Sequence, residues 1–224
     1  MPINNIKNYK HIIWDWNGTL LDDVDIVVDV MNNLLKRRKM PLINKQKYKN
    51  IFTFPVKEYY AQLGFNFLIE PFEKLAIEYI SEYNNNVYQF KLYDGTEKVL
   101  ENISNSGISQ SILSACQEKD LLKAVSKLNI DEYFINIAGL NNYYAVSKVK
   151  RGKDLLTEAG LKPEEVLLIG DTVHDYQVSK ELGCHCLLIS NGHQSYRRIS
   201  NCNTNIVRTI SDVIEFVNKK ANAI

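Results

Sequence analysis

The chain has 224 residues, enough for one hydrophobic core or for a core domain that carries a smaller inserted one. Its 27 Lys and Arg nearly balance its 26 Asp and Glu, so no large basic surface and no nucleic-acid partner is expected. Its 45% hydrophobic and 24% charged residues are typical of an ordinary globular protein and exclude a disordered chain.

The N-terminal residues and the cysteines bear on the cellular compartment. The first ten residues are too polar for a signal peptide, and no apolar run reaches membrane-spanning length. The four cysteines do not form a disulfide framework in a chain of this size. Cys184 and Cys186 are interpreted as the start of a buried strand, with a metal site as the alternative. We expect a cytoplasmic protein with no membrane partner, and the sequence indicates no particular protein partner.

The first predicted element is a short buried strand at His11–Trp14. Residues 22–90 then contain almost no strand signal. Apolar residues spaced near 3.6 predict one helix from Val24 to Leu35 and a second amphipathic helix from Phe72 to Tyr83. The basic run Lys36–Lys39 is interpreted as a solvated last turn that complements the helix dipole, with a docking patch as the alternative.

From residue 93 onward, predicted strands alternate with predicted helices. The strands are Gln110–Leu113, Tyr133–Ile137, Val166–Ile169 and Cys186–Ile189, and the helices are Glu97–Ser104, Lys119–Leu128, Val149–Ala159 and Asp175–Leu182. Strands that are apolar throughout and separated by helices indicate a parallel sheet with both faces covered. The sequence therefore predicts an α/β fold, a doubly wound parallel sheet with a helical insertion after its first strand.

Polar side chains follow the predicted strands, where ligands bind in open parallel sheets. These segments are residues 15–22 (DWNGTLLD), Ser114-Ala115 and residues 170–175 (GDTVHD), and Lys148 precedes the helix that starts at Val149. A carboxylate can act as nucleophile, other carboxylates hold a hard cation, and a hydroxyl and an ammonium group bind phosphoryl oxygens. The pattern predicts phosphoryl-transfer chemistry at one edge of the sheet.

These segments resemble, in order, the four motifs of the haloacid dehalogenase-like hydrolase superfamily, in its phosphoglycolate phosphatase-like branch. The resemblance covers nearly the whole chain. It implies a Rossmann-like core at about residues 1–20 and 92–224 and an inserted all-helical cap at about 21–91. It also implies a Mg²⁺-dependent phosphatase that acts on a small-molecule phosphate ester, phosphoglycolate being one candidate.

The resemblance also implies roles for individual residues. Asp15 corresponds to the nucleophile that forms an aspartyl-phosphate, and it also ligates the metal. The other implied Mg²⁺ ligands are the backbone carbonyl of Asn17, then Asp171, then Asp175 directly or through water. The cation is needed because an anionic carboxylate must approach an anionic phosphate.

A second group of residues is implied to hold the phosphate. Ser114, with Ala115, would bind the phosphoryl oxygens, and Thr19 would support the nucleophile loop. Lys148 would neutralise charge on the phosphate and the nucleophile; it is nearer the start of its helix than the competing bases Lys150, Arg151 and Lys153. His174 is a candidate substrate contact, with a solvent-facing position at the helix start as the alternative.

Asn17 departs from the resemblance. Phosphatases of the family carry an aspartate there, which protonates the leaving alkoxide and then activates water. An amide cannot exchange a proton near neutral pH, so acid-base catalysis worth about 10²–10⁴-fold is missing. Three interpretations follow. The enzyme acts on esters that need little protonation or borrows a base such as His174; it breaks a carbon–halogen or carbon–phosphorus bond; or it is a catalytically impaired phospholigand-binding or partner-binding protein. Retention of Asp171 and Asp175 argues against the halide branch, which needs no metal.

Several further residues have modest interpretations. Trp16 is interpreted as a residue that packs against the cap, with a substrate platform as the alternative. Asp22-Asp23 is interpreted as the acidic start of a cap helix, and residues 93–96 as a turn that begins a helix. His193 is interpreted as part of a polar turn, with substrate contact as the alternative. The sequence of the cap does not identify the substrate, since periodicity does not say which of its side chains face the site. Arg37, Lys57, Tyr59 and Tyr60 are the cap residues that could contact a substrate.

Overall fold

A computed structural model describes residues 9–141 and 148–221, with side chains in the last helix described through Asn218. The strands are β1 (His11–Trp14), β2 (Ser109–Gln117), β3 (Asn136–Leu140), β4 (Val166–Gly170), β5 (His185–Ile189) and β6 (Asn205–Val207). The helices are α1 (Val24–Arg37), α2 (Lys45–Ile51), α3 (Val56–Leu63), α4 (Phe72–Asn84), α5 (Thr96–Asn105), α6 (Glu118–Lys127), α7 (Val149–Glu158), α8 (Val173–Leu182), α9 (Tyr196–Ile199) and α10 (Asp212–Ala221). Short 3-10 turns are η1 (Val87–Gln89), η2 (Asp131–Tyr133) and η3 (Pro163–Glu165).

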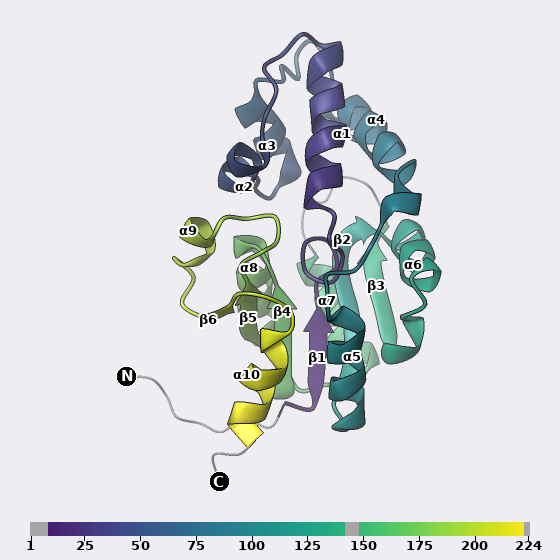
Figure 1. The fold of residues 1–224 in the computed structure, drawn as a ribbon, viewed down its shortest axis with the longest axis vertical. Helices are drawn as coiled ribbons and strands as arrows, with labels where there is room; N and C mark the ends of the chain where they lie inside the picture. The colour runs from purple at the N-terminus through teal and green to yellow at the C-terminus, as the bar shows by residue number, and fades with distance from the viewer. Residues whose placement is uncertain (1–8, 142–147, 222–224) are drawn as a thin grey trace.

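The six strands form one sheet in the order β3-β2-β1-β4-β5-β6, and every neighbouring pair is parallel (Figure 1). Successive side chains of a strand point to opposite faces, so a strand covered on both sides is apolar throughout. Ile12 and Trp14 pack in one cluster with α5, α6 and α10, whereas Ile13 packs in another with α7 and α8. The predicted doubly wound α/β fold is confirmed.

Two details of the sheet differ from the prediction. β3 begins at Asn136 rather than at Tyr133, because residues 131–133 form the 3-10 turn η2. The apolar Tyr133 and Phe134 pack against the core cluster from that turn, which explains why the sequence looked like a strand there. The second difference is β6, an edge strand of three residues that pairs with β5 and is too short to leave a periodic signal.

Helices α1–α4 stand together beyond the carboxyl ends of the strands (Figure 1) and have a hydrophobic cluster of their own, which includes Met31, Leu34, Tyr60 and Leu75. Their two connections to the core lie side by side. The Asp22 amide donates to the Lys91 carbonyl at 2.9 Å, and the Tyr93 amide donates to the Leu20 carbonyl at 3.0 Å. We call α1–α4 the cap; its predicted limits at 21 and 91 stay a prediction.

The basic run at the end of α1 is largely solvated, with Lys36, Arg37 and Lys39 exposed, but its two arginines are paired within the cap. Arg37 pairs with Glu78 and Glu82 of α4, and Arg38 pairs with Glu78 and with Glu70, which precedes α4. The solvated last turn is thus confirmed, since Lys36 and Arg37 are exposed in the last turn of α1, whereas the ion pairs of Arg37 and Arg38 within the cap do not support a docking patch. Periodicity could not identify the acidic partners, because they come from a helix some forty residues away, as the Arg38–Glu78 separation shows.

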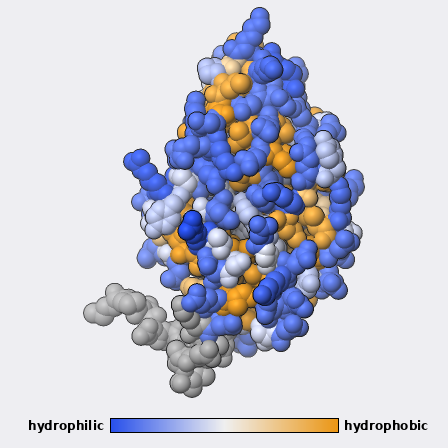
Figure 2. All heavy atoms as spheres, in the orientation of Figure 1, coloured by the Kyte–Doolittle hydropathy of each residue, from blue (hydrophilic) through white to orange (hydrophobic). Residues whose placement is uncertain are grey.

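The surface of the cap carries hydrophobic as well as hydrophilic atoms. On the face drawn in Figure 2, hydrophobic atoms reach the surface in the upper part of the molecule, where Figure 1 has the cap helices. Among the described residues, no helix combines the length and the apolar character that a membrane span requires.

Candidate active site

Three carboxylates meet at the carboxyl edge of the sheet. Asp15 directly follows β1, Asp171 directly follows β4, and Asp175 lies in the first turn of α8. One oxygen of each lies within 4.8 Å of the others, and all three side chains are buried. Buried carboxylate oxygens that converge in this way are the donors that Mg²⁺ prefers. Among the described residues, no other cluster of His, Cys, Asp and Glu has this geometry, so the CxC pair at Cys184 and Cys186 forms no metal site there.

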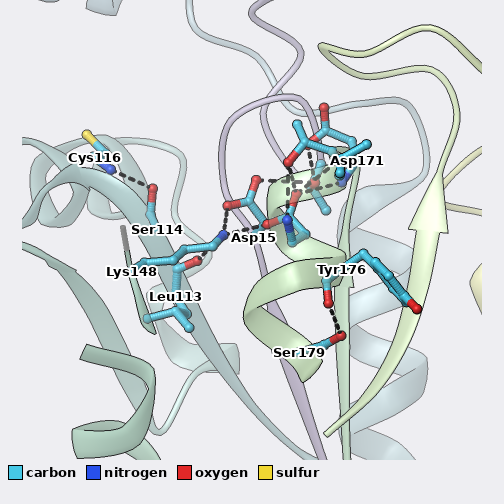
Figure 3. Close-up of polar contacts among 12 residues, drawn as sticks. Asp15, Leu113, Ser114, Cys116, Lys148, Asp171, Tyr176 and Ser179 are labelled. Atoms are coloured by element: carbon cyan, nitrogen blue, oxygen red, sulfur yellow. Dashed lines mark hydrogen bonds and ion pairs between the residues drawn. The ribbon is translucent and has the colours of Figure 1, made fainter. Parts of the chain in front are cut away.

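Lys148 is the cation of this cluster, and it is 1% exposed. Its Nζ pairs with Asp15, pairs with Asp175 at 2.7 Å and donates to the Leu113 carbonyl at 3.1 Å (Figure 3). The competing bases lie elsewhere: Lys150 and Lys153 are exposed, and Arg151 pairs with Glu118 and Glu158. The structure thus brings Lys148 into contact with Asp15, as the order of motifs predicted.

The loop after β1 fits closely around Asp171. Thr19 is buried, and its hydroxyl donates to Asp171 Oδ1 at 3.0 Å, with Asp15 Oδ2 at 3.4 Å as the alternative acceptor. Gly18 has a φ of 74°, and a Cβ there would lie 2.6 Å from Asp171 Oδ2 and 2.4 Å from His193 Cδ2. Only glycine allows both this backbone conformation and this close approach.

Asp175 also organises its own helix. Its Oδ2 accepts hydrogen bonds from the Thr172 hydroxyl at 2.6 Å and from the Thr172 amide at 2.9 Å. The Thr172 hydroxyl in turn caps the Asp175 amide, so the two residues form a capping box at the start of α8. This arrangement holds the other carboxylate oxygen of Asp175 toward Lys148.

The protonation equilibria follow from burial and mutual repulsion. Burial raises the pKa of Asp15; Lys148 acts against this shift, and the charges of Asp175 and Asp171 add to it. Burial also acts to raise the pKa of Asp175, but Lys148 outweighs it and the pKa is lowered. Burial disfavours the charged form of Lys148, yet Asp15 and Asp175 raise its pKa above the ordinary value. A divalent cation would relieve the remaining repulsion among the carboxylates.

Ser114 lies within β2 rather than beyond its end, which corrects the expected end of that strand at Leu113. β2 continues to Gln117, and its register with β3 shifts between Leu113 and Gln117. The irregularity lets the strand continue while Ser114 and Ala115 both line the cavity described below. The Ser114 hydroxyl oxygen accepts the Cys116 amide at 3.0 Å, which leaves its proton available to a ligand (Figure 3).

The sequence profile of one protein family matches most of the chain. The profile of the haloacid dehalogenase-like hydrolases matches residues 12–189. The chain belongs to this family. The expected family and enzyme class, a hydrolase, are thereby confirmed.

Individual relatives are distant in sequence and close in fold. The chain is 22% identical to tyrosine-protein kinase PtkA of Mycobacterium tuberculosis, over 91% of this chain and 70% of the relative. It is 21% identical to phosphoglycolate phosphatase of Rhodobacter capsulatus, over 82% of this chain and 85% of the relative. A haloacid dehalogenase-like hydrolase from Streptococcus pneumoniae superposes with a TM-score of 0.81 at 21% identity, over 93% of this chain and 98% of that one.

The position that departs from the family motif is held in a buried network with the cap. The Asn17 Nδ2 donates to Asp23 Oδ2 at 2.8 Å and to the Tyr83 hydroxyl at 2.9 Å. The Tyr83 hydroxyl donates to the same Asp23 oxygen at 2.6 Å, and the Gly18 amide donates to the other at 3.1 Å. Because a carboxylate only accepts, the amide NH₂ of Asn17 must face Asp23, and both of its protons are used.

His193 completes this network. Its Nε2 lies 3.2 Å from Asp23 Oδ1, its Nδ1 lies 2.9 Å from the Tyr48 hydroxyl, and its backbone amide donates to Asp171. His193 lies in the polar turn after β5, as interpreted, but its ring is buried and lines the cavity described below, so it is more than a turn residue. Asp23 is the N-cap residue of α1, which confirms the acidic helix start, but its side chain makes no cap hydrogen bond and is buried in this network instead. The sequence does place an acidic residue, Asp23, next to the nucleophile loop. It does not indicate that Asn17, Tyr83 and His193 are the partners of this residue.

A cavity of about 150 Å³ lies between this edge of the sheet and the cap. Asp15, Ser114 and Lys148 line it from the core, and Tyr59 and Tyr60 are among the residues that line it from the cap. Trp16 is not among the residues that line it; this residue is 1% exposed and packs in the core cluster, so it is a packing residue as interpreted, but in the core and not against the cap.

His174 also lines the cavity, half-buried, so the solvent-facing alternative is wrong. Its ring stacks on Phe54 with centroids 4.6 Å apart, and burial lowers its pKa to about 4. Its Nε2 is buried with no hydrogen-bond partner among the described residues. A neutral imidazole with an unused nitrogen is therefore available at the wall of the cavity.

Proposed function

We propose that this protein is a Mg²⁺-dependent phosphatase that hydrolyses a small phosphomonoester through an aspartyl-phosphate at Asp15. One observation carries the proposal: Asp15 lies with Asp171 and Asp175 in a buried cluster, and Lys148 contacts it from the other side. A haloacid dehalogenase-like hydrolase that keeps this set has the charges that phosphoryl transfer to a carboxylate requires.

The donor set fits magnesium. Asp15, Asp171 and Asp175 offer carboxylate oxygens, and the backbone carbonyl of Asn17 is the further ligand that the family motif implies. When bound, the cation neutralises charge on the phosphate and the nucleophile as they approach each other. The raised pKa of Asp15 and of Asp171, caused first by burial, supports the presence of a cation when both are ionised.

The chain's own residues supply the nucleophile and the groups that bind the transferring phosphoryl group. An Asp15 oxygen attacks phosphorus and the bond to the ester oxygen breaks, so the leaving group takes the electron pair. Lys148 holds Asp15 and offers positive charge to the transferring group, while the Ser114 hydroxyl can donate to a phosphoryl oxygen. Water then attacks phosphorus, Asp15 is released as a carboxylate, and both protons of the water leave with the product as dihydrogen phosphate.

The names of the relatives support phosphoryl chemistry without naming one substrate. The relatives from Rhodobacter capsulatus and Mycobacterium tuberculosis are called a phosphoglycolate phosphatase and a tyrosine-protein kinase. The rival function is a phospholigand-binding or partner-binding protein with little turnover, and the observation that favours it is Asn17, whose amide protons are both used within the protein. The expected cytoplasmic location remains a prediction.

Phosphate release tests the proposal. Wild type, Asp15→Asn and Asn17→Asp are assayed with and without Mg²⁺ on an aryl phosphate and on a panel of sugar and small-acid phosphates. We expect wild-type turnover that requires Mg²⁺ and falls to background in Asp15→Asn, because the amide cannot form the phosphoenzyme. A wild type that is silent on every ester, while Asn17→Asp is active, would establish the rival function instead.

A further inference from the structure

The cap side of the cavity is apolar and aromatic. Val27 and Met31 come from α1, Phe52 and Phe54 from the segment between α2 and α3, and Tyr79 and Tyr83 from α4; all six line it. Such walls bind a substrate through apolar burial and through stacked or edge-on ring contacts. The whole cavity, which includes the polar side at Asp15 and Lys148, has a volume of about 150 Å³, comparable to that of an apolar cavity that admits a benzene ring.

The charges around the cavity oppose a second anionic group on the substrate. Among the described residues that line it, Lys148 is the only lysine or arginine, and it is already paired with Asp15 and Asp175. Asp23 and Asp120 add two further carboxylates to the lining. The other cationic group of the lining, His193, is paired with Asp23. A substrate carboxylate, as in phosphoglycolate, would enter without a free counter-charge and beside like charges, which is costly in a partly desolvated site.

The leaving group must also depart without protonation by residue 17, because Asn17 cannot act as a general acid. The two amide protons of Asn17 are committed to Asp23 and Tyr83. Asp23 only accepts hydrogen bonds here. His193, the group beside it, has one ring nitrogen toward Asp23 and the other toward Tyr48. A phenol, with a pKa of about 10 like that of tyrosine, leaves as its anion far more readily than an aliphatic alcohol, whose pKa is close to the value of about 16 for water.

We propose that this site, if it is the phosphatase proposed above, acts on aryl phosphates, monoesters of a neutral phenol whose ring occupies the aromatic cap side of the cavity. Asp15 attacks phosphorus, the bond between phosphorus and the phenolic oxygen breaks, and the phenolate leaves with the electron pair and takes a proton from solvent. Hydrolysis of the aspartyl-phosphate then yields dihydrogen phosphate. The lost acid favours a phenolic leaving group, and the aromatic cap favours a ring.

Matched substrates separate ring binding from leaving-group chemistry. Phenyl phosphate has the ring and a phenolic leaving group, benzyl phosphate has the ring and an alkoxide leaving group, and phosphoglycolate has an alkoxide and a carboxylate. We expect wild-type kcat/KM for phenyl phosphate to exceed that for either alkoxide ester by about 10²-fold or more, since that is the usual worth of a missing general acid. Asn17→Asp should raise kcat/KM for benzyl phosphate by about 10²-fold or more and for phenyl phosphate by much less.

A cap variant tests the position of the ring. Phe54→Ala should lower kcat/KM for phenyl phosphate about tenfold, through lost apolar contact, while inhibition by inorganic phosphate stays the same because the core holds the phosphate. An equal loss of phosphate inhibition would mean that Phe54→Ala disturbs the whole site and would remove this support for the ring's position.

The outcomes of the two proposals are distinguishable. Equal wild-type kcat/KM for phenyl and benzyl phosphate would overturn the aryl-phosphate proposal and leave the phosphatase intact. Efficient turnover of phosphoglycolate by wild type would also overturn the aryl-phosphate proposal. Absence of turnover on every ester, in wild type and in Asn17→Asp, would overturn the phosphatase itself.

Discussion

At the scale of single residues, the main feature of this protein is the buried carboxylate of Asp23. It receives hydrogen bonds from Asn17, Gly18 and Tyr83 and pairs with His193, so it joins the nucleophile loop, the cap and the loop after β5. A buried charge with this many partners is costly to break, since removal of one partner leaves the others unsatisfied. The aspartate that the family motif places at Asn17 would put a second negative charge against Asp23, whereas the amide donates to it.

The pairing of His193 with Asp23 predicts a stability that depends on pH. Burial acts to lower the pKa of His193, but the charge and hydrogen bond of Asp23 outweigh it and raise the pKa from 6.5 to about 9. A histidine with a raised pKa contributes stability that is complete below pH 6.5 and is lost as the pH rises through about 9. Wild type should lose up to about 3 kcal/mol of unfolding free energy across that window, and His193→Gln should not. Urea unfolding of both proteins in chelator measures the difference, and parallel pH profiles would contradict it.

At the scale of elements, α8 links helix stability to the active site. Its capping box uses Thr172 and Asp175, so the carboxylate that pairs with Lys148 also begins the helix. The buried position of Thr172 keeps water from competing for these hydrogen bonds. Local helix chemistry therefore orients a residue of the proposed metal site.

Replacement of Thr172 tests this link. Thr172→Ala removes the capping hydroxyl and should lower the free energy of unfolding by about 1–2 kcal/mol, together with Mg²⁺-dependent activity, because Asp175 loses a hydrogen bond at 2.6 Å. Thr172→Ser keeps the hydroxyl and should behave nearly as wild type. Urea unfolding and phosphate release measure the two effects. Equal losses in both variants would mean that the methyl group of Thr172, and not its hydroxyl, is what matters.

At the scale of the whole molecule, the cap is closed onto the core by polar contacts at both sides of the cavity. Lys49 Nζ donates to the Asn191 carbonyl at 2.8 Å, and Gln194 and Arg198 donate to the Phe52 carbonyl. Across the cavity, Asn84 donates to Asp120 at 2.9 Å. Closure of this kind shields the cavity from bulk water.

Magnesium should stabilise the whole fold, and more so at higher pH. Burial is the first cause of the raised pKa of Asp15 and of Asp171, for which it reaches about 6. The repulsion among the ionised carboxylates destabilises the protein above these pKa values and is relieved by protons as the pH falls, so the cation has most to offset at high pH. Saturating Mg²⁺ should raise the thermal unfolding midpoint by about 5–10 °C near pH 8 and by clearly less near pH 5.5.

Differential scanning calorimetry with Mg²⁺ or chelator checks this effect, with Asp171→Asn as the control that should abolish the shift. A shift that is the same at both pH values, or that persists in Asp171→Asn, would mean that the cation binds elsewhere.

The sequence by itself determined the parallel sheet, the helical segment after β1, the family and the convergence of Asp15, Lys148, Asp171 and Asp175. The sheet, the helical segment and the convergence follow from local apolar patterns and from the rule that parallel strands end at one edge, which needs no knowledge of distant neighbours. The family follows from the resemblance of the segments around these residues to the family's motifs. Only the tertiary structure decided the acidic partners of Arg37 and Arg38, the network of Asp23 with His193 and the aromatic lining of the cavity. Periodicity states which face of a helix is apolar, but the residue it meets there comes from another part of the chain and is set by packing.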